Sequence, residues 1–426
     1  MKTTILGIGS LLLCSNVMAA TVFHVGKLID GISDGPRAKM TVVVEEGRIV
    51  KVAPGYLKTS DGDTLVNLKD KTLLPGFIDM HVHLAYTPSR QSYMEPFTLD
   101  PTDHALRGAL FAKQTLEAGF TTVRDLGDAG NSVIALRNAI DKGYLPGPRI
   151  FAAGTALATT GGHADPTNGR NQALRQDPGP KQGVINNPED AFKAVRQRYK
   201  DGSDVIKLTA TGGVLSVAKS GDNPQFRDEE LKAVVAAAKD YGFKVAVHAH
   251  GKEGMRRAIE AGVNSIEHGT YMDDALYPLM KQHGTWYVPT LTAGAYVAEM
   301  AAIEGFYPEV VRPKAARIGP KIINTFGKAY AAGVPIAFGT DAGVFPHGDN
   351  AREFALMVKA GMPEMEAIKS ATVNAATLLG AEDQLGSISE GRYADMVVVE
   401  GDPLENIAVL EQPFQVYKGG SVVYQF

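Results

Sequence analysis

The chain has 426 residues, of which 44% are hydrophobic and 21% charged, a length that fits two or three domains or one α/β barrel with an appendage. Its formal net charge of −4 provides no basic field, so neither nucleic acid nor an anionic membrane surface is an expected partner. A small-molecule substrate is compatible with this charge.

The first twenty residues differ in character from the rest of the chain. Lys2 precedes an apolar run over residues 5–13, and small residues stand at 19–20, where a signal peptidase would cut. We predict a signal peptide over residues 1–20 and therefore an exported protein, periplasmic or secreted. The run is too short to span a bilayer, and no later stretch reaches about 18 apolar residues, so no membrane span is expected.

The only cysteine, Cys14, lies within this predicted signal. Leu13 is too bulky for the position before a lipoprotein cysteine, which makes a lipoprotein the less favoured alternative. A mature chain without cysteine has no thiolate to offer as a nucleophile or ligand. Any metal must then be held by nitrogen and oxygen atoms.

Both ends of the chain have strand patterns joined by tight turns, including Glu46-Gly47 and Gly419-Gly420. The strand-forming segments are residues 41–44, 48–52, 394–399, 414–417 and 421–424. We predict that residues 21–74 and 383–426 fold together as one small β-sandwich.

Between these ends, over residues 75–382, short apolar strands alternate with helical patterns. After the opening strand that leads to His81, the predicted strands are residues 121–126, 149–153, 204–208, 244–248, 265–268, 286–290 and 335–341. Two of the helical patterns stop at Gly242 and Gly262, as helix C-termini do. Eight alternations predict an α/β fold, a (β/α)8 TIM barrel.

In a barrel the functional side chains lie at the C-terminal ends of the strands. Five of the predicted strands end in nitrogen- or oxygen-bearing side chains: His81, His83, Lys207, His248, His268 and Asp341. Each alone has a structural explanation, such as a hydrogen-bonded core histidine or a helix cap. Together they predict a metal site, and four imidazoles with one carboxylate suit zinc, or manganese, cobalt or nickel.

Lys207 needs a separate explanation, because a lysine amine is normally protonated at pH 7 and cannot bridge two cations. Reaction with carbon dioxide would convert it into a carbamate, whose two oxygens can each bind one metal. We therefore predict two divalent metal ions, zinc being favoured, and a carbamylated Lys207.

Several motifs resemble those of the amidohydrolase superfamily, binuclear-metal subtype. They are residues 76–83 (GFIDMHVH), Lys207, residues 247–251 (VHAHG), residues 265–269 (SIEHG) and residues 338–342 (FGTDA). Residues 212–216 and 224–226 resemble the imidazolonepropionase-related branch, which contains Xaa-Pro dipeptidases and ochratoxinase-type amidases. The resemblance covers nearly the whole chain after residue 20 and implies a homo-oligomer.

The resemblance also implies a role for each residue. His81, His83 and Asp341 would hold the more buried metal, and His248 and His268 the more exposed one, with Lys207 between them. His248 rather than His250 is the expected ligand. Asp341 would also be the catalytic residue. It would accept a proton from the water shared by the two metals, which becomes the attacking hydroxide, and pass that proton to the leaving amine.

His163 and His250 are expected to contact substrate. His163 lies in the irregular segment 159–187, which follows the third predicted strand on the side where barrels place their active sites. His347 and the pair Arg124-Asp125 receive a structural interpretation instead.

The predicted function is metal-dependent hydrolysis of the amide bond before a C-terminal amino acid, in Xaa-Pro-like dipeptides, N-acyl amino acids or ochratoxin-type amides. A cyclic amidase, lactonase or deaminase on the same scaffold is the enzymatic alternative, because activated water attacks those substrates equally well. A barrel that serves only as a binding protein is the less favoured alternative, since the ligand set of His81 to Asp341 is intact.

Overall fold

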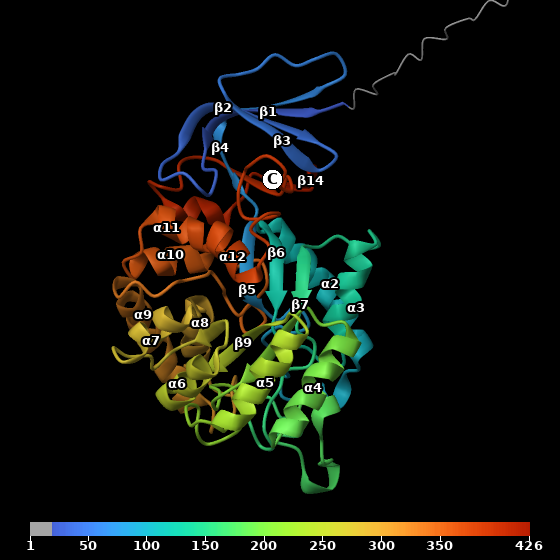
Figure 1. Ribbon diagram of the computed structural model, residues 1–426, viewed down its shortest axis with the longest axis vertical. Helices are drawn as coiled ribbons and strands as arrows, with labels where there is room; N and C mark the ends of the chain where they lie inside the picture. The colour runs from blue at the N-terminus through green and yellow to red at the C-terminus, as the bar shows by residue number, and fades with distance from the viewer. Residues whose placement is uncertain (1–18) are drawn as a thin grey trace, which may run out of the picture.

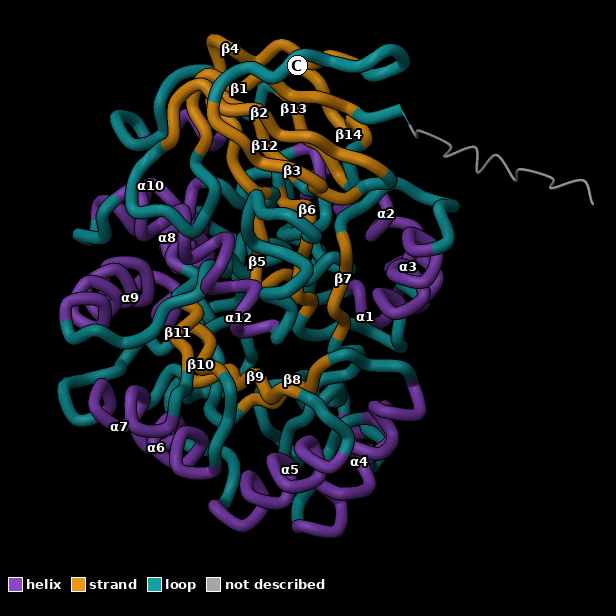
Figure 2. Tube along the Cα trace, turned by 45° about the horizontal axis from the view of Figure 1, so that its top comes forward, coloured by secondary structure: helices purple, strands orange, loops and turns teal. Residues whose placement is uncertain are grey.

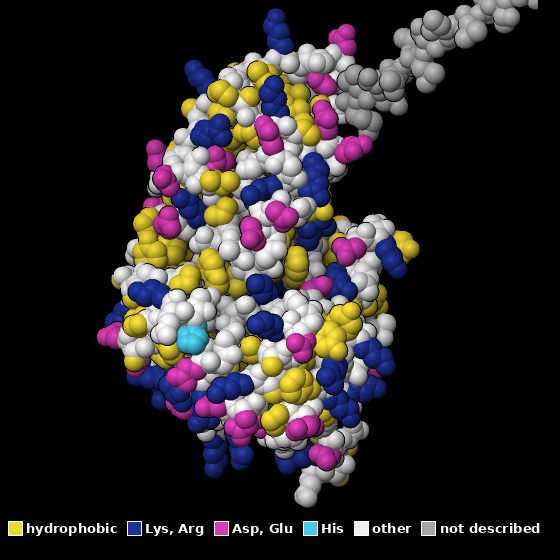
Figure 3. Space-filling view, in the orientation of Figure 1, with side chains coloured by type: hydrophobic (Ala, Val, Ile, Leu, Met, Phe, Trp, Pro, Cys, Tyr) yellow, Lys and Arg dark blue, Asp and Glu magenta, His cyan; other side chains and the backbone are white. Residues whose placement is uncertain are grey.

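The computed structural model describes residues 19–426; residues 1–18, which carry Cys14 and most of the predicted signal peptide, lie outside the described part. A β-sheet built from both ends of the chain lies at the top of Figure 1, above a larger region of alternating strands and helices. On the face in Figure 3, positive and negative side chains are interspersed. Among the helices of residues 19–426, none has both the length and the apolar character needed to cross a bilayer.

The upper sheet has seven strands in the order β14-β13-β12-β4-β1-β2-β3. Their bounds are Thr21–Leu28 (β1), Arg37–Glu45 (β2), Arg48–Pro54 (β3), Thr64–Pro75 (β4), Met396–Val399 (β12), Gln415–Lys418 (β13) and Ser421–Gln425 (β14). Strand β4 joins the two chain ends, because it pairs in parallel with β1 and antiparallel with β12.

The predicted sandwich of two sheets is therefore replaced by one continuous sheet. A bridge between Arg48 and Tyr393 brings the start of β3 back toward the segment before β12, so the sheet curls on itself. Its inner face buries side chains from both chain ends, among them Phe23, Val42 and Tyr417. The period-two alternation of these strands places one side of each in this core.

The lower region contains two parallel sheets. The first has the order β5-β6-β7, with bounds Phe77–Val82, Phe120–Asp125 and Arg149–Ala152; the second has the order β11-β10-β9-β8, with bounds Trp286–Val288, Ser265–His268, Lys244–Ala249 and Val205–Thr209. The segment after β7 contacts the second sheet through a parallel bridge between Leu157 and Leu208 of β8. Short, fully buried strands of this kind are typical of parallel α/β cores, and the α/β prediction is confirmed.

The predicted eighth strand, residues 335–341, is not a regular strand. It makes one bridge from Ile336 to Tyr287 of β11, and the adjoining Ala342 makes another to Val82 of β5. Asp341 has a left-handed backbone, with φ of 63°, so the extended conformation ends there. The segment nevertheless occupies the place between β11 and β5 that the prediction assigns to it.

Helices cover the outside of these sheets, and Figure 2 shows α4 to α7 lying outside β8 to β11. The helix bounds are Glu95–Thr98 (α1), Pro101–Glu117 (α2), Ser132–Asp141 (α3), Pro188–Asp201 (α4), Asp228–Asp240 (α5), Lys252–Ala261 (α6), Leu276–His283 (α7), Leu291–Ala301 (α8), Arg312–Ala331 (α9), Arg352–Lys359 (α10), Glu364–Lys369 (α11) and Ala375–Leu379 (α12). Helix α6 ends at Gly262 with φ of 91°, as its sequence predicts.

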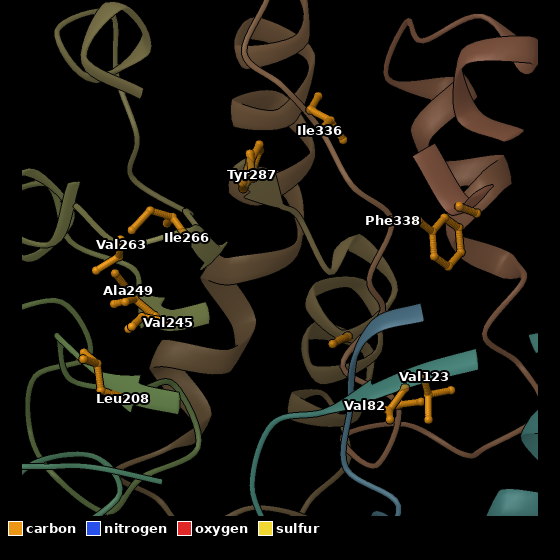
Figure 4. Packing of buried hydrophobic residues seen from close by; sticks show 14 of the residues in the cluster. Val82, Val123, Leu208, Val245, Ala249, Val263, Ile266, Tyr287, Ile336 and Phe338 are labelled. Carbon is orange, nitrogen blue, oxygen red and sulfur yellow. The ribbon is translucent and has the colours of Figure 1, made fainter. Parts of the chain in front are cut away.

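The core of the lower region is continuous between strands and helices, and Figure 4 shows part of it. Phe338, just before the site residue Asp341, is fully buried. Its ring lies 4.4 Å from the ring of Phe354 on α10 and 5.5 Å from the ring of Phe120 on β6, between centroids. This aromatic cluster anchors the irregular segment that carries Asp341.

Replacing Phe338 by alanine should therefore lower the free energy of unfolding by about 3–5 kcal/mol, because it leaves a cavity in a packed aromatic cluster. Leu110→Ala on α2, where the side chain is 55% exposed, is the matched control and should change stability by less than about 0.5 kcal/mol. Urea denaturation followed by circular dichroism measures both. Equal effects of the two substitutions would contradict the anchoring role.

Candidate metal centre

One cavity of about 770 Å³ lies where the strands of the lower region end. All eight site residues predicted from the sequence line it: His81, His83, His163, Lys207, His248, His250, His268 and Asp341. They lie on β5, β8, β9 and β10 or directly after these strands, in the irregular segment that ends at Asp341, and in the loop after β7. The structure thus brings together side chains that the sequence spreads over 261 positions, from 81 to 341.

Three of these residues place their ligand atoms in one small group. His81, His83 and Asp341 each offer an atom, and these atoms all lie within 4.8 Å of one another. Asp341 Oδ1 is 3.5 Å from His81 Nε2 and 3.4 Å from His83 Nε2. Two imidazoles and one carboxylate at this spacing fit a divalent cation.

Hydrogen bonds determine which nitrogen of each imidazole faces the group. His81 Nδ1 donates to Glu267 Oε2 at 2.9 Å, and His83 Nδ1 donates to the Gly127 carbonyl oxygen at 2.9 Å. Each ring therefore turns its Nε2, the nitrogen that carries the lone pair, toward the group. This is the arrangement that metal-bound histidines have in proteins.

His248 and His268 lie beside this group. The His268 ring is 4.9 Å from the His81 ring and 4.7 Å from the His248 ring, between centroids. His248 Nε2 donates to the Gly212 carbonyl oxygen at 3.1 Å, so its free lone pair is on Nδ1; His268 Nδ1 is hydrogen-bonded to the Thr290 hydroxyl at 2.8 Å. Each ring is thus held in one orientation by a hydrogen bond at one of its two nitrogens.

Lys207 and the remaining histidines complete the lining. Lys207 Nζ is 3.4 Å from His81 Nε2. His250 Nδ1 is hydrogen-bonded to the Thr270 hydroxyl at 2.8 Å, and the His163 ring lies 4.4 Å from the His248 ring, between centroids. A Cβ on Gly213 would lie 2.1 Å from His163 Cε1, so glycine is required at 213 to admit the His163 ring.

Burial shifts the pKa of each of these groups in the direction that favours its neutral form. It lowers the pKa of His83 to about 3, of His163 to about 4 and of His250 to about 3. It also lowers the pKa of Lys207 to about 8 and raises the pKa of Asp341 to about 7. Neutral imidazoles are the form that binds metal, so the histidines of the site fit a divalent ion.

A second layer of buried polar residues supports the centre, and sequence reasoning assigned it no role in metal binding. Glu267, which holds His81, is fully buried and accepts from Arg124 Nη2 at 2.8 Å. Asp79 accepts from the Thr340 backbone N–H at 3.0 Å and from Asn350 Nδ2 at 2.8 Å, which ties the Asp341 segment to β5. Their positions next to the candidate ligands could have identified them from the sequence: Glu267 directly precedes His268, and Asp79 directly precedes Met80-His81.

Two further residues of the cavity lining were missed because no pattern in the sequence marks them. Arg170 lies in the loop after β7, and Tyr307 lies between α8 and α9. Among the described residues, neither Arg170 Nε nor the Tyr307 hydroxyl has a hydrogen-bond partner. The structural interpretation of His347 agrees with its contacts, since its ring stacks on Phe111 and its Nε2 donates to the Tyr86 carbonyl oxygen.

The sequence is similar to known proteins over most of its length. Residues 72–423 match the model of the amidohydrolase family. The chain is 32% identical to ochratoxinase of Aspergillus niger over 428 aligned positions, covering 94% of this chain and 86% of that protein.

Two solved structures are similar over nearly the whole chain. One is a Xaa-Pro dipeptidase with methionine bound in its active site, at a TM-score of 0.93 and 53% identity, covering 96% of this chain and all of that one. The other is a prolidase complexed with N-methylphosphonate-L-proline, at a TM-score of 0.87 and 31% identity, with coverage of 96% and 100%. These matches imply a TIM-barrel-type fold with an additional domain, and amidohydrolases typically use divalent metals. The chain therefore belongs to the amidohydrolase family, in the branch that holds these dipeptidases and ochratoxinase, and is a hydrolytic enzyme.

Proposed function

We propose that this enzyme is a binuclear-metal hydrolase that removes a C-terminal amino acid by cleaving the amide bond before it. Its substrates would be Xaa-Pro-like dipeptides or N-acyl amino acids, ochratoxin-type amides included. The observation that carries the proposal is the convergence of His81, His83 and Asp341 within 4.8 Å in a cavity also lined by Lys207. The Xaa-Pro dipeptidase, the prolidase and ochratoxinase support the choice of bond.

Two divalent ions, zinc in our proposal, would be held by the histidines and Asp341. His81, His83 and Asp341 would hold one ion, and His248 and His268 the other. Lys207, 3.4 Å from His81 Nε2, would bridge the two as a carbamate. When bound, such ions supply an activated water and polarise the scissile carbonyl.

The protein's own groups then carry the proton and orient the amide. Asp341, beside both imidazoles of β5, accepts the proton of the attacking water and passes it to the departing amine nitrogen. The rings of His163 and His250 lie beside the His248 ring, and they would donate hydrogen bonds to the carbonyl oxygen or to the substrate carboxylate.

A free C-terminal carboxylate needs a positive partner, and we assign this role to Arg170, which lines the same cavity. Among the described residues that line the cavity, Arg170 is the arginine and Lys207 is the lysine. Because Arg170 Nε has no partner among the described residues, its guanidinium is available for a planar, two-oxygen acceptor. This charge favours substrates that end in a carboxylate over neutral amides.

The direct test is a panel of dipeptides and N-acyl amino acids, incubated with enzyme purified with zinc, with release of free amino acid as the readout. We expect amino-acid release that a chelator abolishes and added zinc restores. Ammonia release or ring opening without amino-acid release would contradict the proposal in favour of a deaminase, cyclic amidase or lactonase. Absence of all turnover with metal bound would favour a binding protein.

Asp341→Asn should lower kcat by about 10²–10⁴-fold, because asparagine keeps an oxygen toward the metal but cannot carry the proton. Metal content, measured by elemental analysis, should remain close to that of the wild type. Wild-type turnover in this variant would contradict the proton role of Asp341.

Lys207→Ala should lose most activity, and added formate or acetate should restore part of it by supplying the missing bridging carboxylate. The wild-type enzyme with the same salts is the control and should not be stimulated. Unaffected turnover in the variant, or equal stimulation of both proteins, would contradict a bridging carbamate.

A further inference from the structure

The cavity extends beyond the metal centre into an apolar lobe that the proposed chemistry does not use. We define this lobe by six lining residues from the loop after β8, from α8 and α9, and from the loop between those helices: Val214, Leu215, Val297, Phe306, Ile318 and Ile322. Most of them belong to, or pack against, one separate hydrophobic cluster around Val297 and Tyr307.

The lobe begins at the metal centre. Thr290, Ala293, Gly294 and Val297 all line the cavity, and their spacing places them on one face of α8 and its N-terminal cap. Thr290 is hydrogen-bonded to His268 at 2.8 Å. Since a helix rises 1.5 Å per residue, Val297 lies about 10 Å farther along the axis. The lobe therefore runs about 10 Å along α8 from the metal centre, which is enough to take one long side chain.

The loop wall of the lobe is held in place by two side chains, Lys314 of α9 and Tyr93. Lys314 Nζ on α9 donates to the carbonyl oxygens of Gly213 at 3.1 Å, Ser216 at 2.7 Å and Ala218 at 2.8 Å. The Tyr93 hydroxyl donates to the Leu215 carbonyl oxygen at 2.8 Å. These four hydrogen bonds keep Val214 and Leu215 against the lobe, so the lobe is formed before a ligand enters.

Tyr307 places one polar atom in this apolar environment. The residue is only 8% exposed, and its hydroxyl has no hydrogen-bond partner among the described residues. A buried hydroxyl without a partner is costly, so a ligand atom that reaches it gains a hydrogen bond that the protein alone lacks.

The charges around the cavity disfavour a cationic side chain. Of the acidic residues in its described lining, Glu95 is paired with Arg107 at 2.8 Å, Asp128 accepts from two backbone N–H groups of the following turn, and Asp341 belongs to the metal centre. A lysine or arginine side chain in the lobe would therefore lose water without gaining a carboxylate.

We propose that the apolar lobe binds a bulky, uncharged side chain of the substrate, and that Tyr307 hydrogen-bonds a polar atom near the end of that side chain. This inference rests on the proposed function and narrows its substrate class. The substrates are dipeptides or N-acyl amino acids in which one side chain beside the scissile amide is large and neutral, with tyrosyl favoured over phenylalanyl.

The test compares peptides with alanine, phenylalanine, tyrosine or lysine at one position, in two series: Xaa-Pro and Ala-Xaa. In one of the two series, kcat/KM should be about ten- to hundredfold higher for phenylalanine than for alanine, and lowest for lysine. Tyr307→Phe should lower kcat/KM for the tyrosine peptide by about three- to tenfold and leave the phenylalanine peptide within twofold.

Tyr296→Phe is the matched control, because Tyr296 lies on α8 next to the lobe residue Val297 but is not part of the cavity lining. This variant should change neither the preference for phenylalanine over alanine nor the preference for tyrosine over phenylalanine. Equal rates for alanine and phenylalanine in both series, or an unchanged tyrosine preference in Tyr307→Phe, would overturn the inference.

Calorimetric binding of the same peptides to the Asp341→Asn variant gives a readout that needs no turnover. If no peptide is hydrolysed by the wild type, the proposed function is wrong, while tyrosine binding more tightly than phenylalanine, alanine and lysine would still support the lobe. Hydrolysis without this order of rates and affinities would leave the proposed function standing and refute the lobe.

Discussion

The metal centre depends on the hydrogen bond from His81 Nδ1 to the Glu267 carboxylate, which is paired in turn with Arg124. All three side chains are at most 1% exposed, so the ion pair has lost its water. Such pairs contribute little net stability, but breaking one leaves an uncompensated buried charge at a cost of about 3–5 kcal/mol. We infer that this network is retained for orientation, because it directs His81 Nε2 toward Asp341.

Backbone conformation adds a second constraint on the same centre. His268, Thr290 and Asp341 are not glycines, yet all three have left-handed backbones, with φ of 70°, 55° and 63°. Each such residue costs about 1–3 kcal/mol and persists only where the surroundings hold it. His268 is held by the Tyr287 hydroxyl on its carbonyl oxygen, and the Asp341 segment by Asp79. Lys39, Glu46 and Asn131 have the same conformation elsewhere, so part of the backbone strain of the described residues lies at the two candidate ligands His268 and Asp341.

Much of the fold could be predicted because buried parallel strands and helix ends leave local patterns in the sequence. The predicted strand over residues 265–268 matches the bounds of β10, and α5 ends at Asp240, just before the predicted stop at Gly242. The pattern was misleading for residues 335–341, which are as apolar as a strand. There Gly339 packs closely against His81 and Val288, and the left-handed Asp341 ends the extended backbone. The two chain ends do fold together, but as one curled sheet, because β4 pairs with strands from both ends of the chain.

The sequence by itself determined the residue types of the site and the strand ends that carry them, because metal ligands require particular atoms and barrels present them at particular places. Only the tertiary structure decided which nitrogen of each imidazole is free, since His81 is oriented by Glu267 across 186 positions of the chain. It also decided that Arg170 and Tyr307 face the same cavity as His81. Neither residue has a motif or a period, because a substrate pocket is lined by loops whose meeting depends on packing rather than on local sequence.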